Sequence, residues 1–186
     1  MKWQAAAAGG GLTLITPTSI ANSGGTATLS GAITTASSVN SVSFNGVFSS
    51  TYVNYLIVYN ELTGSTTLQT KMKLRVSGTD TSGTAYFMGG DRRAWGAGAS
   101  GGYSENGSDN WGVNIQTGNT YKTGGTINVF SPNIAAMTSY TQVFVGNESA
   151  GYNGGVHNST TQFDGFSIIA STGTISGIFR VYGISN

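Results

Sequence analysis

The residues LQTKMKLRV at positions 68–76 alternate strictly between side chains that prefer a core and side chains that prefer water. Met72 and every second residue on either side of it point one way, while Lys71, Lys73 and Arg75 point the other way. This period of two predicts a half-buried antiparallel β-strand. We expect its basic face to be a solvated face or a sheet edge rather than a ligand site.

Upstream, residues 52–59 read YVNYLIVY, which is apolar on both faces and rich in β-forming residues. This pattern predicts a central strand that is covered on both sides. Shorter runs of the same kind predict further strands at 42–48, 85–88, 111–115, 126–130, 141–145, 163–169 and 175–182. Gly, Ser and Asn clusters separate these runs, and no stretch keeps a helical period. The chain therefore predicts an all-β fold, an antiparallel β-sandwich of jelly-roll type, over residues 39–186.

Two glycine-rich stretches interrupt this rhythm, at 89–110 and at 146–161. Neither stretch shows a strand pattern. Loops of this length in compact domains are usually functional or disordered. We therefore expect any binding residues to lie there.

Residues 1–38 differ from the rest of the chain, because small Ala, Gly, Ser and Thr residues dominate them. Their few apolar anchors include Trp3, Leu12, Leu14 and Ile15. One interpretation is a frayed terminus, as chain ends often are. The other is an extended N-terminal arm that becomes ordered when it docks on another subunit. Four alanines run straight into glycine at the start, so the apolar core of a signal peptide is missing.

The chain is poor in charge. Charged residues make up 8% of its 186 residues, the formal net charge is +1, and residues 3–60 carry no charged side chain, whereas an ordinary domain has about 25% charged residues. Such a chain has no basic field for nucleic acid and no run of about 20 apolar residues for membrane insertion. We expect neither partner. With 11% aromatic residues it still has the means to build a core.

The residues also argue against catalysis. His157 is the only histidine and there is no cysteine, so a nucleophile would have one candidate base and no thiolate alternative. A lone histidine is more often a hydrogen-bonding structural residue. Seven acidic residues are spread singly along the chain, and the run at 105–109 lacks the acidic alternation of a calcium loop. We predict no catalytic residue, no metal site and no cofactor.

Sugar binding without cleavage fits the composition better. Trp95, Tyr103 and Tyr152 lie in the glycine-rich stretches near Asn and Asp residues. Aromatic rings beside hydrogen-bonding groups are suited to stacking on a glycan or a receptor. Trp111 is a further aromatic residue of this kind, but it opens a predicted strand, so a core position is the alternative interpretation for it.

The C-terminal part resembles a known group. FDGFSII at 163–169, STGTISG at 171–177 and RVYGI at 180–184, together with VSFNGVFSSTY at 42–52 and LRVSGTD at 74–80, resemble small virion proteins of tailed bacteriophages. The resemblance implies a non-enzymatic surface protein, such as a capsid decoration, knob or short tail fibre. It also implies homo-oligomers, commonly trimers, on a virion assembled in the host cytoplasm.

On this interpretation the N-terminal arm binds other virion proteins, and the sandwich forms the homo-oligomeric head. The alternative function is a carbohydrate- or receptor-binding module for host attachment, which would bind a host surface glycan. A hydrolase that uses His157 is the least favoured of the three hypotheses.

Overall fold

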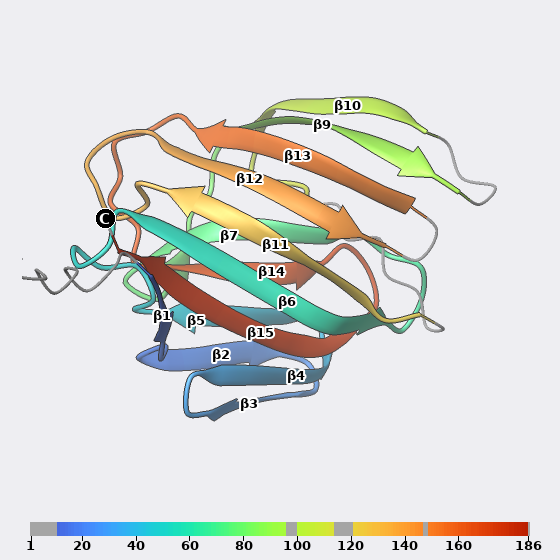
Figure 1. Ribbon diagram of the computed structural model, residues 1–186, viewed down its shortest axis with the longest axis horizontal. Coiled ribbons are helices and arrows are strands. Elements are labelled where there is room, and N and C mark those ends of the chain that lie inside the picture. The colour runs from blue at the N-terminus through green and yellow to red at the C-terminus, as the bar shows by residue number, and fades with distance from the viewer. Residues whose placement is uncertain (1–10, 96–99, 114–120, 147–148, 186) are drawn as a thin grey trace, which may run out of the picture.

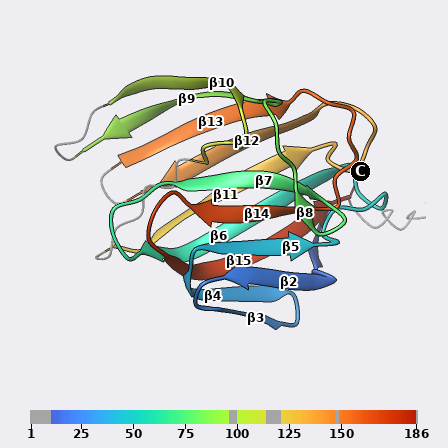
Figure 2. The ribbon, with the colours of Figure 1, turned by 180° about the vertical axis from the view of Figure 1, so that it is seen from behind.

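The computed structural model describes residues 11–95, 100–113, 121–146 and 149–185, and all regular elements within them are β-strands. The strands form two sheets that pack face to face, with the larger sheet in front in Figure 1 and the smaller one in front in Figure 2. Every strand pair is antiparallel. The predicted all-β antiparallel sandwich is confirmed. No helix in these ranges has the length and apolarity to cross a bilayer.

The larger sheet, sheet A, has ten strands in the described residues. In spatial order they are β10 (Gly101–Ser108), β9 (Tyr86–Ala94), β13 (Ser149–His157), β12 (Thr138–Val145), β11 (Thr123–Phe130), β6 (Asn54–Gly64), β15 (Ile175–Ile184), β4 (Ile33–Val39) and β3 (Thr26–Ser30), with β1 (Leu12–Ile15) also on β15. Sheet B, as far as the structure describes it, has five strands. They are β2 (Ser19–Ser23), β5 (Ser41–Asn45), β14 (Gly165–Ala170), β7 (Thr70–Val76) and β8 (Thr79–Asp80).

The connections have the wrapped order of a jelly roll. The chain crosses from sheet A to sheet B between β4 and β5 and between β6 and β7, and it returns to sheet A between β14 and β15. The last two strands then lie between the earlier ones: β15 lies between β4 and β6, and β14 lies between β5 and β7. Each sheet is therefore completed by the C-terminal part of the chain.

Both strands that the sequence predicts most clearly are present. In β7, Thr70, Met72 and Leu74 are buried against the core while Lys71 is exposed. β6 alternates buried and half-buried residues, with β11 on one side and β15 on the other, so it is a central strand. Arg75 departs from the expected pattern, because it is buried although it lies on the polar face of β7.

Aromatic side chains fill much of the space between the sheets. Phe44 of sheet B stacks on Phe166, with 4.6 Å between ring centroids, and meets Phe179 of sheet A edge-on at 5.6 Å. Trp111 is fully buried and packs 4.5 Å from Tyr140, also measured between ring centroids. Trp111 is thus a core residue and not a contact residue.

Sheet A has more strands than sheet B, so part of its inner face has no strand of sheet B opposite it. In both views β9, β10 and β13 extend past β7, the last long strand of sheet B (Figures 1 and 2). The backbone at Trp111 continues sheet B by one bridge to Met72, with mutual N–H to carbonyl bonds of 2.8 and 3.0 Å. Beyond that bridge, the inner face of β10 is open.

The two glycine-rich stretches are largely strands and not long loops, so this expectation was wrong. Residues 89–110 contain most of the β9–β10 hairpin, and residues 146–161 contain β13. Glycine is needed here because β13 and β9 pair closely: a Cβ at Gly155 would lie 2.1 Å from the carbonyl oxygen of Phe87. Glycine has low β-propensity, and this concealed the strands in the sequence.

The N-terminal part also joins the sheets. β1 pairs with β15, β2 with β5, and β3 with β4, so residues 12–38 are not separated from the sandwich at position 38. Small hydroxyl side chains allow this pairing without supplying the apolar pattern that predicts it. Residues 1–10, including Trp3, lie outside the described ranges.

Candidate functional site

The three aromatic residues predicted to contact a glycan or receptor lie in different places. Trp95 follows β9 and its surface is 61% exposed. Tyr152 is 64% exposed and lies on the outer face of sheet A, since its neighbour Asn153 is buried on the inner face. Tyr103 is half-buried on the inner face of β10. The fold therefore does not bring these three rings together into one platform.

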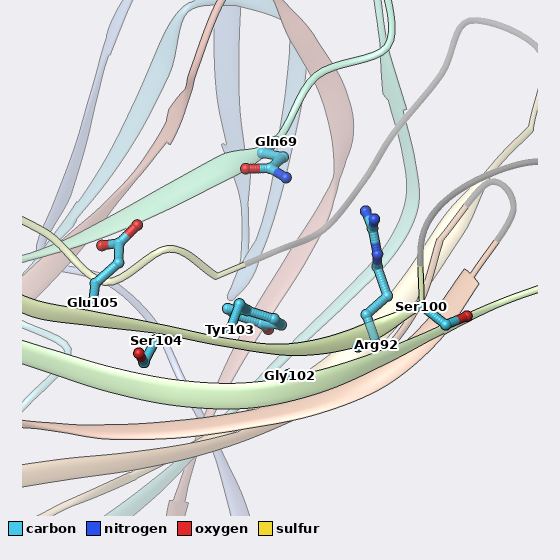
Figure 3. Close-up of a pocket in the computed structure, with 8 residues that line it drawn as sticks. Gln69, Arg92, Ser100, Gly102, Tyr103, Ser104 and Glu105 are labelled. Carbon is cyan, nitrogen blue, oxygen red and sulfur yellow. The ribbon is translucent and has the colours of Figure 1, made fainter.

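Tyr103 lines a cavity. The cavity has a volume of about 330 Å³ and lies at the open inner face of the β9–β10 hairpin. Its lining residues come from both sheets and are Gln69, Arg92, Ser100, Gly101, Gly102, Tyr103, Ser104 and Glu105. This is the candidate site (Figure 3).

Strand geometry explains how the side chains of the cavity converge. Residues Gly101, Tyr103 and Glu105 are two apart on β10 and so share its inner face. Arg92 lies directly opposite Gly101 in the register of β9 and β10. In Figure 3 the Tyr103 ring lies between the side chains of Arg92 and Glu105, and Gln69, from the other sheet, faces them.

A buried amide holds Tyr103 in place. Asn153 Nδ2 donates to the Tyr103 hydroxyl oxygen at 3.1 Å and to the Gly112 carbonyl at 3.2 Å. Asn153 is only 3% exposed, and its Oδ1 has no hydrogen-bond partner in the described residues. The sequence pointed to Tyr103 but gave no sign of Asn153, because the two are 50 residues apart and meet only through the pairing of β13, β9 and β10.

His157 has a structural environment. It ends β13 and is buried, with the Tyr86 ring 4.5 Å and the Phe163 ring 4.9 Å from its own ring centroid. Its Nδ1 is 2.9 Å from Ser159 Oγ, and its Nε2 has no partner within the described ranges. Burial lowers the pKa of His157, so the imidazole is neutral near pH 7. No described acid orients it.

The acidic residues stay dispersed. Asp109 Oδ2 accepts a hydrogen bond from Lys73 Nζ at 2.8 Å, and this contact lowers the pKa of Asp109. Glu61 pairs in the same way with Lys122 at 2.8 Å. Among the residues that the structure describes, no three His, Asp or Glu side chains gather as a metal site would require.

A polar cluster that the sequence did not reveal stabilises the outer face of sheet B. Arg75 donates to Asn45 Oδ1 at 3.0 Å, to Ser43 Oγ at 3.0 Å and to Ser167 Oγ at 2.8 Å, and it also contacts Asp80. Ser167 Oγ donates to Asp80 Oδ1 at 2.6 Å. The arginine is thus a satisfied structural ion, and these partners come from three other strands, β5, β8 and β14.

The outer face of sheet A carries exposed apolar side chains. Val143 and Tyr152 lie opposite each other on β12 and β13, and both are more than 60% exposed. Val145 and, at the other side of the sheet, Leu12 and Leu14 are exposed too. We call these five residues the outer apolar surface. Ile15, the remaining predicted docking residue, is half-buried against the core.

The register connects the two ends of the outer apolar surface. Leu14 lies opposite Tyr182, and Tyr182 lies opposite Leu56. Two residues after Leu56 on β6, Val58 pairs with Thr126 of β11, and Thr126 pairs with Val143 of β12. The outward positions along this path are mainly apolar or hydroxyl-bearing, but Arg180 lies opposite Val58 on the same face and donates to Asn60 Oδ1 at 2.8 Å. The charged pair Asp91 and Arg93 lies at the margin of this path, with 3.1 Å between the paired atoms.

Comparison with known proteins does not assign the chain: no protein-family model matches it, and no curated protein matches it.

Proposed function

We propose that this chain is a non-enzymatic structural protein that assembles with copies of itself through the outer face of sheet A. The observation that carries the proposal is the outer apolar surface, on a sheet face that has few charged groups. Exposed apolar patches with a polar surround are typical of protein interaction sites. A second copy of the same face is a chemically matched partner, because neither copy has to desolvate many ions.

The energetics favour this use of the surface. Burying apolar area contributes about 25 cal/mol per Å², and a stable interface buries about 800 Å² on each partner. A ten-stranded sheet offers a broad, continuous face for such contact. We propose a homo-oligomer, and the sequence resemblance makes a trimer the expected form. In a trimer one part of this face on each copy would contact a different part of it on the next copy.

The setting that we propose is the outside of a bacteriophage particle, as a decoration, knob or short fibre. Support for the setting comes from the sequence resemblance. The exposed Leu12 and Leu14 at the N-terminal side are candidates for contact with other virion proteins. The absence of an activated histidine in the described residues agrees with a structural role.

A carbohydrate- or receptor-binding module is the second candidate function. The cavity beside Tyr103 favours it, since this cavity combines an aromatic ring with polar groups from both sheets. The two functions can occur together, because the cavity and the outer apolar surface are on opposite faces of sheet A.

Placing a charge on the outer apolar surface tests the assembly proposal. Val143→Glu should reduce the oligomer to monomers, because each copy would bury a carboxylate without a partner. The mass of the purified protein in solution, measured by sedimentation or native mass spectrometry, shows whether it is an oligomer or a monomer. We expect at least a tenfold increase in the dissociation constant, since tenfold corresponds to about 1.4 kcal/mol.

The matched control is Lys71→Glu, which places the same side chain at an exposed position on sheet B. This variant should keep the mass of the unaltered protein. A monomeric unaltered protein, or an oligomer that survives Val143→Glu, would contradict assembly through this face.

A further inference from the structure

We infer that the cavity under the β9–β10 hairpin binds a neutral saccharide ring, stacked on Tyr103. This inference concerns the inner face of sheet A and does not depend on assembly through the outer face. The cavity lies where sheet A extends past β7, and Gln69, which directly precedes β7, faces Tyr103 of β10 across it (Figure 3). A volume of about 330 Å³ lies at the small end of ligand sites and suits a mono- or disaccharide.

The chemistry of the lining selects a sugar over other small ligands. An aromatic ring offers an apolar face for the C–H groups of a pyranose. On one side of this ring, the Glu105 carboxylate can only accept hydrogen bonds, and on the other side the Arg92 guanidinium can only donate them. A ligand that satisfies both must carry donors and acceptors around an apolar face, which describes a polyhydroxylated ring.

The charges of the lining argue against ionic ligands. Arg92 and Glu105 contribute one positive and one negative charge, so these two residues give the lining no net charge that would favour an anion or a cation. Gln69 and the serine side chains add neutral hydrogen-bonding groups. Arg92 also has contacts within the protein.

The Tyr103 hydroxyl is prepared to donate to a ligand. The Gly112 carbonyl is an acceptor, so the Asn153 atom that lies 3.2 Å from it must be the amide nitrogen. The same nitrogen lies 3.1 Å from the Tyr103 oxygen, which therefore accepts. No acceptor for the phenol hydrogen is found among the described residues. Because Asn153 and Tyr103 both lie on strands, the ring is held rigidly before a ligand arrives.

A protein-observed NMR titration tests the inference. The probes are the methyl glycosides of glucose, galactose, mannose, N-acetylglucosamine and rhamnose, added to the full-length protein. At least one probe should shift the amide signals of Gly101, Gly102 and Ser104 in a saturable way. If no probe shifts these signals, or if saturable shifts appear only elsewhere, the inference is overturned.

Substitutions then locate the contact. Tyr103→Ala should weaken binding roughly tenfold or more, since the stacking of the sugar on the aromatic ring and a hydrogen bond are lost together. The matched control is Tyr152→Ala, which removes an equally large ring from the outer face and should leave the affinity unchanged. Equal losses in the two variants would overturn the assignment to this cavity.

Two further variants serve if Tyr103→Ala does not fold. Glu105→Gln and Gln69→Ala change exposed side chains, and each should weaken binding several-fold while the fold is kept. Unchanged affinity in both would contradict the site. All cavity variants should retain the oligomer mass of the unaltered protein, so failure of this inference is distinguishable from failure of the assembly proposal.

Discussion

His157 shows how burial converts a residue of possible chemical use into a structural one. Its ring lies edge-on to both Tyr86 and Phe163, and its Nδ1 contacts Ser159. Charging this ring would place a cation among aromatic side chains in the core, with Nε2 lacking an acceptor in the described residues. The neutral form is therefore the one that the fold accommodates.

A pH dependence of stability follows from this environment. The pKa of His157 is lowered by burial from its ordinary value of 6.5, so the unfolded chain binds the proton more readily than the folded chain. The free energy of unfolding should be constant above about pH 7 and should fall as the pH drops below about 6.5, until the folded histidine also titrates. Urea denaturation across this range measures the effect.

The control for this pH dependence is His157→Gln, which removes the titrating group. Its free energy of unfolding should be lower overall but flat between about pH 7 and pH 5. The lowered pKa values of Asp109 and Glu61 act only at more acidic pH. A slope that persists in the variant would contradict the role of His157.

For single residues, the sequence was a better guide to what a side chain can do than to where that side chain lies in the fold. It left Trp111 open between a contact residue and a core residue and argued against His157 as a base, and both residues are buried in aromatic surroundings. It grouped Trp95, Tyr103 and Tyr152 as contact candidates, although they lie on different surfaces. Which face of a strand a residue occupies depends on the strand register, and glycine-rich strands do not show their register in the sequence.

Glycine residues allow the neighbouring strands β9 and β13 of sheet A to lie close together. On β9, Gly89 and Gly90 are adjacent and point to opposite faces of the sheet. A Cβ at Gly90 would lie 2.5 Å from the carbonyl oxygen of Tyr152, whereas the nearest atom to a Cβ at Gly89 would be 3.7 Å away. One position is therefore closed to side chains and the other is open.

This contrast gives a direct test of the β9–β13 pairing. Gly90→Ala should destabilise the protein by about 1–3 kcal/mol, because overpacking forces the backbones apart. Gly89→Ala should change stability by less than about 1 kcal/mol, and by restricting the unfolded chain it can even stabilise. Thermal or urea unfolding measures both. Equal effects of the two substitutions would show that β9 and β13 do not pair in this register.

For whole elements, prediction from sequence succeeded where strands are apolar and failed where they are glycine-rich. β6 and β7 have clear patterns, because large side chains cover one or both faces. β9, β10 and β13 rely on backbone pairing and on packing against Tyr140 and Phe144 from neighbouring β12. Those supporting contacts are long-range, and a local pattern cannot reveal them. The candidate cavity was missed for the same reason.

At the scale of the whole molecule, the N-terminal strands are part of the sandwich that they were expected to precede. β1 pairs with β15 of sheet A, and β2 pairs with β5 of sheet B. Ile15 and Ile20 pack against the core. The docking role that we propose for the N-terminal side therefore has to be separated from a role in folding.

Two truncations make this separation. Removing residues 1–10 deletes no described strand, so the melting temperature should change little. Removing residues 1–23 deletes β1 and β2 and should lower the melting temperature by about 5 °C or more, as expected for a loss of a few kcal/mol. Calorimetry compares the two proteins. Equal melting temperatures would show that β1 and β2 contribute no stability to the sandwich.

The shorter truncation also addresses attachment to the particle. If residues 1–10 carry the docking contacts, the protein that lacks them should fold and oligomerise but should be missing from purified particles. Its presence there at the normal amount would place the docking contacts elsewhere in the chain.

The position of β14 and β15 in the middle of the two sheets has a consequence for how the protein is made. During synthesis, β5 and β7 leave the ribosome without the strand that joins them, as do β4 and β6. Neither sheet can close until β14 and β15 have been synthesised, because each of them occupies the place between two strands that are made earlier. Closure of the sandwich therefore depends on strands that are made after most of the residues of its core.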